Sequence, residues 1–316
     1  MSLFALASLK GAPGTTTLAC LVAATWPLDR RVVVAECDPC GGDLAARFEL
    51  STAKGCLSLA TAARRDRDSV ELEPHVQRLP GGLEVLVGGS SSEMALAQSV
   101  TWSNVNQAVV DVASTVDVVA DLGRLAAPYN ESRQLLQNAQ ALGVLIGPDQ
   151  ASVAHAMDQR ELLSGLCGER ISLMIVGRGT YRSRDIESLT GMRVSAEVPH
   201  DPAAAAVASG AASGARRLAR SVLVKSARRI ADSFAALDGP SSRSTDNEAN
   251  QYCEADTSND GQGIGKGDAI GSAAPTGEHE RGTRSGEHER GTRSGEHERG
   301  TRSGDQPPPS SLKVLP

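Results

Sequence analysis

Apolar and polar residues follow one another along this chain in blocks. Short runs of consecutive apolar residues are separated by segments in which apolar residues recur every three or four positions. The runs that predict strands lie at 2–9, 30–37, 82–88, 116–123, 141–147, 170–177 and 193–199. The segments that predict helices lie at 15–26, 103–114, 131–139, 151–165 and 201–209. Strands without a polar side are typical of a parallel sheet covered on both faces, so we predict an α/β fold with one doubly wound, mostly parallel sheet in a domain spanning residues 1–238.

A last helix is predicted at residues 214–237. Its apolar stripe consists of Leu223, Ala227, Ile230, Phe234 and Leu237. Basic residues flank the stripe: Arg216, Arg217, Arg220, Lys225, Arg228 and Arg229. A basic amphipathic helix can lie on an anionic membrane or pack against a sheet. Because 79 residues follow this helix, we favour packing against the sheet and expect no stable membrane insertion.

The composition changes from Gly239 onward. Ser, Gly, Asn, Asp and Thr dominate residues 239–316, so too little apolar surface is present to offset the entropy of folding. The unit GEHERGTRS occurs three times in tandem, at 277–285, 286–294 and 295–303. Its histidines could collect a metal ion, although a solvated spacer is the simpler interpretation. We predict a disordered, low-complexity tail.

Composition and charge narrow the class of protein. No stretch reaches the roughly 18 unbroken apolar residues of a membrane span, and the first residues lack the pattern of a secretory signal. We therefore expect a cytoplasmic protein. The formal net charge is -6, yet residues 1–238 carry 23 Lys and Arg against 25 Asp and Glu. This nearly neutral balance gives only weak support to nonspecific DNA binding.

A glycine-rich turn, KGAPGTTT at residues 10–17, joins the first strand to the first helix. Backbone N–H groups and a helix N-terminus can hold phosphate in this context. The Walker pattern places lysine directly after the last glycine, but that position is Thr15 here. Threonine has no charge to offset the β- and γ-phosphates, and Pro13 removes one N–H group from the loop.

On this segment the chain resembles the deviant-Walker P-loop ATPases of the MinD/ParA family, whose loop reads KGGxGKT[ST]. The resemblance implies a degenerate Walker A motif, with ATP and Mg²⁺ as cofactors. It also implies that Lys10 is the signature lysine, which reaches across an ATP-dependent homodimer, and that Thr16 helps to hold Mg²⁺. The residues around the phosphates would be Gly11, Ala12, Gly14, Thr15, Thr16 and Thr17.

Other blocks follow the order of the same family across residues 2–237. VVVAECDPCGGDL resembles switch I, which makes Asp38 the carboxylate that acts on Mg²⁺ and on the attacking water. VDVVADLG resembles Walker B with switch II, which makes Asp121 the Mg²⁺-side carboxylate and Gly123 the γ-phosphate sensor. Gly147 and Gly177 stand where the family has asparagines near the base, so adenine specificity does not follow from the resemblance.

Structural alternatives exist for several of these residues. A carboxylate at the end of a parallel strand can simply cap the next helix, and Lys10 can be an exposed loop lysine. Arg124 could supply the charge that Thr15 lacks, or be a surface arginine. The cysteines of CDPC, Cys37 and Cys40, are interpreted as thiols beside a tight turn rather than as a redox pair or half a zinc site.

Two functions of different classes follow. The first is a nucleotide-responsive switch or positioning protein, dimeric and with weak or no ATP hydrolysis, which serves chromosome partitioning, division-site placement, or pilus or secretion assembly through a protein partner. The second is a pseudo-ATPase scaffold or dimerisation module that needs no nucleotide. The resemblance supports the first function, and the missing lysine supports the second.

Overall fold

The structure, a computed structural model, describes residues 1–10, 14–27, 29–66, 71–89 and 102–237. The predicted tail at 239–316 lies outside the described residues, as do Gly11, Ala12 and Pro13 of the glycine-rich turn.

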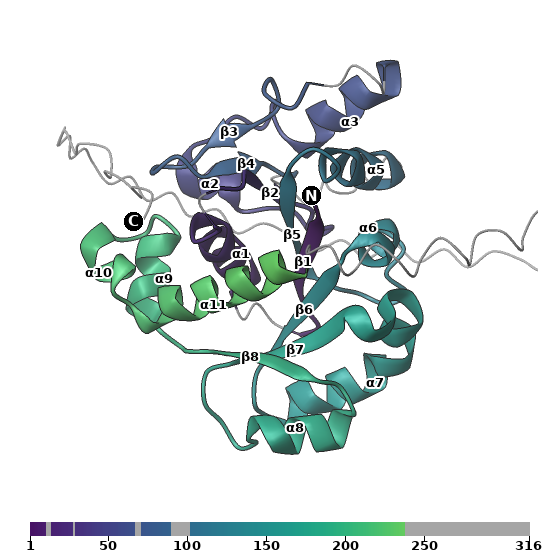
Figure 1. Ribbon diagram of the computed structural model, residues 1–316, viewed down its shortest axis with the longest axis vertical. Coiled ribbons are helices and arrows are strands. Elements are labelled where there is room, and N and C mark those ends of the chain that lie inside the picture. The colour runs from purple at the N-terminus through teal and green to yellow at the C-terminus, as the bar shows by residue number, and fades with distance from the viewer. Residues whose placement is uncertain (11–13, 28, 67–70, 90–101, 238–316) are drawn as a thin grey trace, which may run out of the picture. The chain divides into compact units, whose positions relative to one another are not determined.

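Eight strands form one sheet in the order β3-β4-β2-β5-β1-β6-β7-β8 (Figure 1). The strands are β1 (Leu3–Ser8), β2 (Val32–Glu36), β3 (Gln77–Arg78), β4 (Glu84–Leu86), β5 (Asp117–Arg124), β6 (Ala141–Ile146), β7 (Ile171–Val176) and β8 (Val194–Val198). Only β3 and β4 pair in the antiparallel sense among the described strands. The predicted α/β fold with a mostly parallel sheet is confirmed. The two-residue β3 at the edge was not predicted, because it is too short to show an apolar pattern.

Helices cover both faces of the sheet. One face carries α1 (Thr15–Ala24), α2 (Leu44–Phe48), α9 (Pro202–Ala208), α10 (Ala215–Ala219) and α11 (Val222–Ala236). The other carries α3 (Cys56–Arg65), α5 (Trp102–Val112), α6 (Arg133–Asn138), α7 (Gln150–Cys167), which runs into the short 3-10 turn η1 (Gly168–Arg170), and α8 (Ser183–Thr190). β1 shows why both layers are apolar: Leu3 and Ala5 pack into one, while Phe4 and Leu6 pack into the other.

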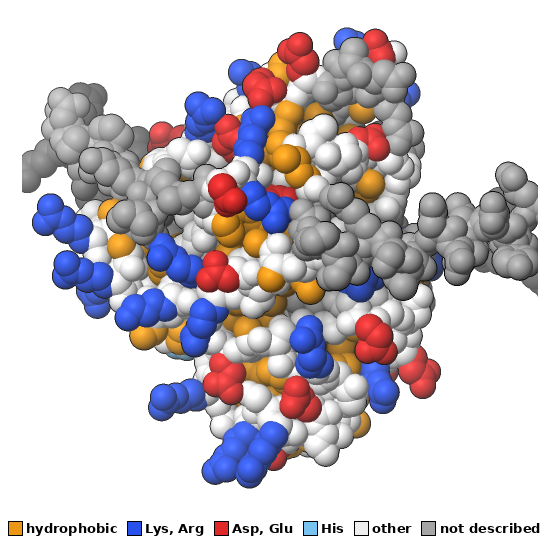
Figure 2. All heavy atoms as spheres, viewed as in Figure 1, with side chains coloured by type: hydrophobic (Ala, Val, Ile, Leu, Met, Phe, Trp, Pro, Cys, Tyr) orange, Lys and Arg blue, Asp and Glu red, His pale blue; other side chains and the backbone are white. Residues whose placement is uncertain are grey.

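The single helix predicted at 214–237 is in fact two helices. The Ser221 hydroxyl accepts the Val224 N–H at 3.1 Å and so begins α11 as an N-cap. The predicted packing of this segment against the sheet is confirmed, since Phe234 stacks on Phe4 with ring centroids 5.0 Å apart. Figure 2 shows Lys and Arg side chains gathered over α10 and α11. None of the described helices combines the length and apolarity needed to cross a bilayer.

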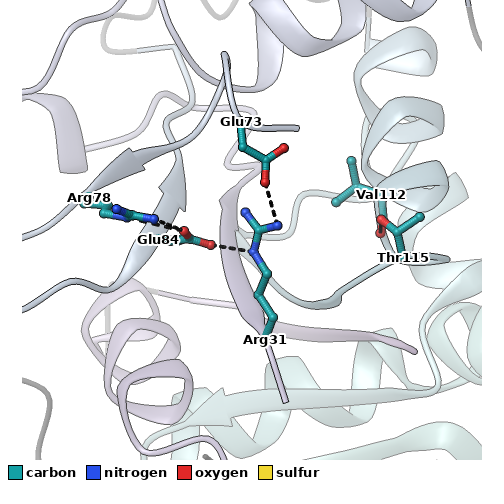
Figure 3. Close-up of polar contacts among 6 residues, drawn as sticks. All are labelled: Arg31, Glu73, Arg78, Glu84, Val112 and Thr115. Atoms are coloured by element: carbon teal, nitrogen blue, oxygen red, sulfur yellow. Dashed lines mark hydrogen bonds and ion pairs between the residues drawn. The ribbon is translucent and has the colours of Figure 1, made fainter. Parts of the chain in front are cut away.

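Ion pairs connect the start of β2 to the β3–β4 edge (Figure 3). Glu84 accepts from Arg31 Nε at 2.8 Å and from Arg78 at 2.9 Å, and Arg31 also donates to Glu73 at 2.8 Å. Because these guanidinium groups are solvent-exposed, each pair contributes about 1 kcal/mol or less.

A second carboxylate, that of Asp117, lies at the N-terminal end of β5. Asp117 is fully buried and accepts three donors: the Ser2 N–H at 3.0 Å, the Trp26 indole N–H at 2.9 Å and the Arg30 guanidinium at 2.6 Å. Its charge is therefore compensated within the fold.

Candidate functional site

The carboxyl ends of β1, β5 and β2 lie side by side, since β5 pairs with both of the others. Asp121 of β5 lies opposite Leu6 of β1 and Glu36 of β2. Beyond the paired residues, Cys37 N–H donates to the Asp121 carbonyl at 2.7 Å, and the Ser8 hydroxyl donates to the Gly123 carbonyl at 3.2 Å. The loops that follow these strands therefore emerge together at the edge where ligands bind in open α/β sheets.

The glycine-rich turn ends in a left-handed residue. Gly14 has φ 90° and ψ 33°, a conformation that glycine adopts at little cost, and its carbonyl accepts the first bond of α1 from Leu18 N–H at 2.8 Å. The first turn of α1 contains no acidic residue, so the positive end of the helix dipole is not neutralised locally. Thr15 is buried, and its Oγ1 has no hydrogen-bond partner among the residues that the structure describes. The lysine position thus holds an uncharged side chain that points into the protein.

Asp121 is fully buried with one oxygen unsatisfied. Its Oδ1 accepts the Gly123 N–H at 3.0 Å, while Oδ2 has no hydrogen bond of regular geometry within the described part of the chain. Burial raises the pKa of Asp121 to about 6, against the lowering effects of the nearby Thr16 hydroxyl and the Gly123 N–H. A buried oxygen without a partner, beside a hydroxyl, is a donor pair suited to Mg²⁺.

Asp38 lies against Gly123. Its Oδ1 accepts the Cys40 N–H at 2.8 Å, and its Oδ2 is 1.8 Å from where a Cβ atom on Gly123 would stand. Burial raises the pKa of Asp38 to about 6, and the charges of Glu36 and Asp43 add to the shift. Neither Asp38 nor Asp121 caps a described helix, so the helix-cap alternative does not explain them.

Glu36 was missed by the sequence reasoning. It is fully buried at the end of β2, and its carboxylate accepts three backbone N–H groups: Asp43 at 2.7 Å, Leu44 at 2.9 Å and Gly88 at 3.0 Å. Burial raises its pKa despite these bonds. Glu36 therefore fixes the loop that carries Asp38, and the signal for it was a single charge at the end of the run VVVAE.

The remaining predicted residues surround this centre. Lys10 is exposed and Thr16 and Thr17 are half-buried. Asp149 lies two residues after Gly147. It is the N-cap of α7, and its side chain accepts the Ser152 N–H at 3.0 Å. Hydrogen bonds from Ser152 lower the pKa of Asp149.

The CDPC cysteines do not form a pair. Cys37 is buried and Cys40 is exposed, and both are free thiols. The strongest influence on the Cys37 thiol is a hydrogen bond with Cys56, which together with burial raises its pKa. This agrees with two thiols beside a tight turn.

Mg²⁺ with a polyphosphate fits these residues better than a metal held by protein alone. Across the described residues, no three His, Cys, Asp or Glu side chains gather closely enough to bind a metal ion. Asp121 and Thr16 supply two oxygen donors, which is the usual number where phosphate oxygens and water complete the shell. A cavity of about 320 Å³ lies elsewhere, at the C-terminal end of α1 beside Trp26 and Leu83, and its mainly apolar walls do not suit phosphate.

Comparisons with known proteins identify the fold. No family model and no curated protein sequence matches the chain. A ParA family ATPase from Chlorobium tepidum TLS is similar in structure, with TM-score 0.62, 19% identity, and coverage of 73% of this chain and 98% of that chain. The septum site-determining protein MinD of Pyrococcus horikoshii OT3, complexed with Mg-ADP, gives TM-score 0.61 and 14% identity over 75% and 97% of the two chains. A complex of a Cyanothece McdA variant with ATP gives a TM-score of 0.55 and 14% identity, with coverage of 76% of this chain and 98% of that chain. From β1 to α11, the chain thus has the fold of the ParA and MinD P-loop ATPases.

Proposed function

We propose that this chain is a nucleotide-responsive switch of the kind that positions other cellular components, and that it binds Mg-ATP with slow or absent hydrolysis. The observation that carries the proposal is the convergence of the α1 N-terminus, Asp121 with its unsatisfied oxygen, and Asp38 against Gly123. Solved neighbours with the same fold include MinD with Mg-ADP and McdA with ATP, which supports a nucleotide as the ligand.

Each residue has a role in this proposal. Backbone N–H groups of Gly11, Ala12 and Gly14 through Thr17 hold the phosphates, as helix N-termini do. Thr16 and Asp121 hold Mg²⁺, which would neutralise charge on the phosphates when it is bound. The Asp38 carboxylate acts on Mg²⁺ and orients the attacking water. Gly123 senses the γ-phosphate, and Asp38 packs directly against it.

Thr15 limits turnover in this proposal. Phosphoryl transfer relies on fixed positive charge around the transferred group, and losing one such group typically costs about 3–4 kcal/mol of transition-state stabilisation. Thr15 is buried and uncharged, so it cannot supply this charge. Binding persists because the backbone donors and the two carboxylates remain.

A homodimer and a protein partner complete the proposed switch. Lys10 is exposed at the end of β1, where a second subunit can meet it. Among the solved neighbours are a MinC:MinD complex and a plasmid partition protein, which makes partner-controlled positioning in division, partitioning or secretion the cellular role that we propose. DNA is a weaker candidate partner, supported by the basic side chains over α10 and α11 in Figure 2.

The test is a titration of the full chain with fluorescent ATP and GTP analogues, with and without Mg²⁺. We expect saturable binding that requires Mg²⁺ and is lost in Asp121→Asn. Asp117→Asn is the matched control, because it removes a fully buried carboxylate from the opposite end of the same strand. Absence of binding at millimolar nucleotide, or equal loss in both variants, would contradict the switch and favour a scaffold that needs no nucleotide.

A further inference from the structure

A basic face covers the last two helices of the fold. It consists of exposed side chains on α10, on α11 and between them: Arg216, Arg217, Arg220, Lys225, Arg228 and Arg229. Figure 2 shows Lys and Arg side chains gathered there. The opposite side of α11 packs into the core through Leu223, Ala227 and Ile230, so the basic residues face outward. Asp232 is the only acidic residue in the sequence from 214 to 237, which leaves this face with an excess of positive charge.

Most of this charge has no partner within the described part of the chain. Five of the six side chains form no ion pair with a carboxylate there: Arg216, Arg217, Arg220, Lys225 and Arg229. Lys225 and Arg229 also stand four residues apart on α11, a spacing at which like charges repel one another. An anionic partner on this face would relieve that repulsion.

The sequence that follows α11 contains the complementary charge. Residues 246–260, DNEANQYCEADTSND, are called the acidic segment here; they contain no Lys or Arg and five acidic residues: Asp246, Glu248, Glu254, Asp256 and Asp260. The rest of the tail at 239–316 has 9 Lys and Arg against 8 Asp and Glu. The negative charge of the tail is therefore concentrated in one segment, and that segment is the part nearest to α11.

The acidic segment begins close enough to α11 to fold back on it. Asp246 follows Leu237, the last described residue, by nine positions, and nine extended residues span up to about 30 Å. Lys225 precedes Leu237 by 12 positions, or roughly 18 Å along a helix. Because both partners belong to one chain, they meet at an effective concentration of about 1 mM, so exposed ion pairs that are individually weak can act together.

We propose that the basic face of α10 and α11 is a docking surface for the acidic segment of the same chain. Carboxylates of the segment then occupy the face, and any other polyanion must displace them before it binds there. The contact consists of exposed ion pairs, so it weakens as the salt concentration rises. It requires no nucleotide and is therefore independent of the proposed switch.

Carbodiimide cross-linking of the full chain tests the contact. This reagent joins a carboxylate to an amine only where the two touch, and Lys225 is the one lysine of the basic face. Mass spectrometry is expected to find Lys225 joined to the acidic segment at about 20 mM NaCl, with about fivefold less product at about 500 mM. Lys54, which is also exposed, is the internal control and is expected not to form this product. Mixing heavy-isotope-labelled and unlabelled chains distinguishes contacts within one copy from contacts between copies.

Binding of heparin, a sulfated polysaccharide, measures whether the basic face is occupied. One variant neutralises the acidic segment by Asp246→Asn, Glu248→Gln, Glu254→Gln, Asp256→Asn and Asp260→Asn. It is expected to bind heparin about fivefold more tightly than the parent, because the face is then open. The matched control makes the same change in net charge within the repeats, by replacing five glutamates with glutamine: Glu278, Glu280, Glu287, Glu289 and Glu296. We expect it to bind within about twofold of the parent.

Several results would overturn this docking. They are the absence of product at Lys225, as much product at Lys54, and product that joins only a labelled to an unlabelled copy. Equal strengthening of heparin binding in the two charge variants, or no change in either, would overturn it as well.

Discussion

The Asp38 carboxylate occupies the space that a side chain on Gly123 would need, since Oδ2 lies 1.8 Å from the position of a Cβ atom there. Gly123 also has φ +55°, in the left-handed region that disfavours other residues. The contact joins the loop after β2 directly to the loop after β5. Asp38 and the backbone at Gly123 therefore cannot move independently.

Gly123→Ala is expected to displace Asp38 and to cost about 1–3 kcal/mol in the free energy of unfolding. Because the coupling between the two loops is broken, we also expect the ratio of ATP to ADP affinity to fall toward one. The control is Gly177→Ala, which is strained at φ +81° but meets only His200 Cβ at 3.4 Å. Titrations with both nucleotides check this, and an unchanged ratio in Gly123→Ala would argue against the sensor role.

Asp121→Asn is expected to make the nucleotide-free protein more stable. Burial raises the pKa of Asp121 to about 6, from an ordinary value near 3.8, so keeping the ionised group in the fold costs up to about 3 kcal/mol above pH 6. The folded state binds more protons than the unfolded state between these values, so this penalty shrinks as the pH falls below 6 and disappears below about pH 4. Urea unfolding at pH 7.5 and pH 5 measures the gain, which should be smaller at pH 5. A loss of stability at pH 7.5 would contradict the expectation.

Glu36→Ala is expected to destabilise the protein by about 2–4 kcal/mol, because three backbone N–H groups lose their shared acceptor. Glu84→Ala removes a carboxylate with two exposed partners (Figure 3), so about 1 kcal/mol or less is expected from it. Chemical denaturation compares the two variants. Equal losses would show that Glu36 does not hold the loop that carries Asp38.

The fold could be predicted from the sequence because its strands are continuous apolar runs. Every predicted strand is present, and the carboxylates at the ends of two of them, Asp38 and Asp121, come together because neighbouring parallel strands end at one edge. The order of strands in the sheet required the structure, since it depends on contacts between segments far apart in the sequence.

The supporting residues could not be predicted in the same way. In the sequence, Glu36 looks like an ordinary charge at the end of a strand. Only the folded chain shows that its carboxylate accepts the backbone N–H groups of Asp43, Leu44 and Gly88. The break at Ser221 was missed, although the predicted apolar stripe begins only after it, at Leu223.

The central claim is that the α1 N-terminus and the ends of β2 and β5 form one site for a polyphosphate. Calorimetric titration of the full chain with Mg-ATP, Mg-ADP and AMP tests it most directly. The account predicts that affinity falls stepwise as phosphates are removed and that Asp121→Asn abolishes the difference between ATP and AMP. Equal affinity for all three nucleotides, or no binding of Mg-ATP at millimolar concentration, would contradict it.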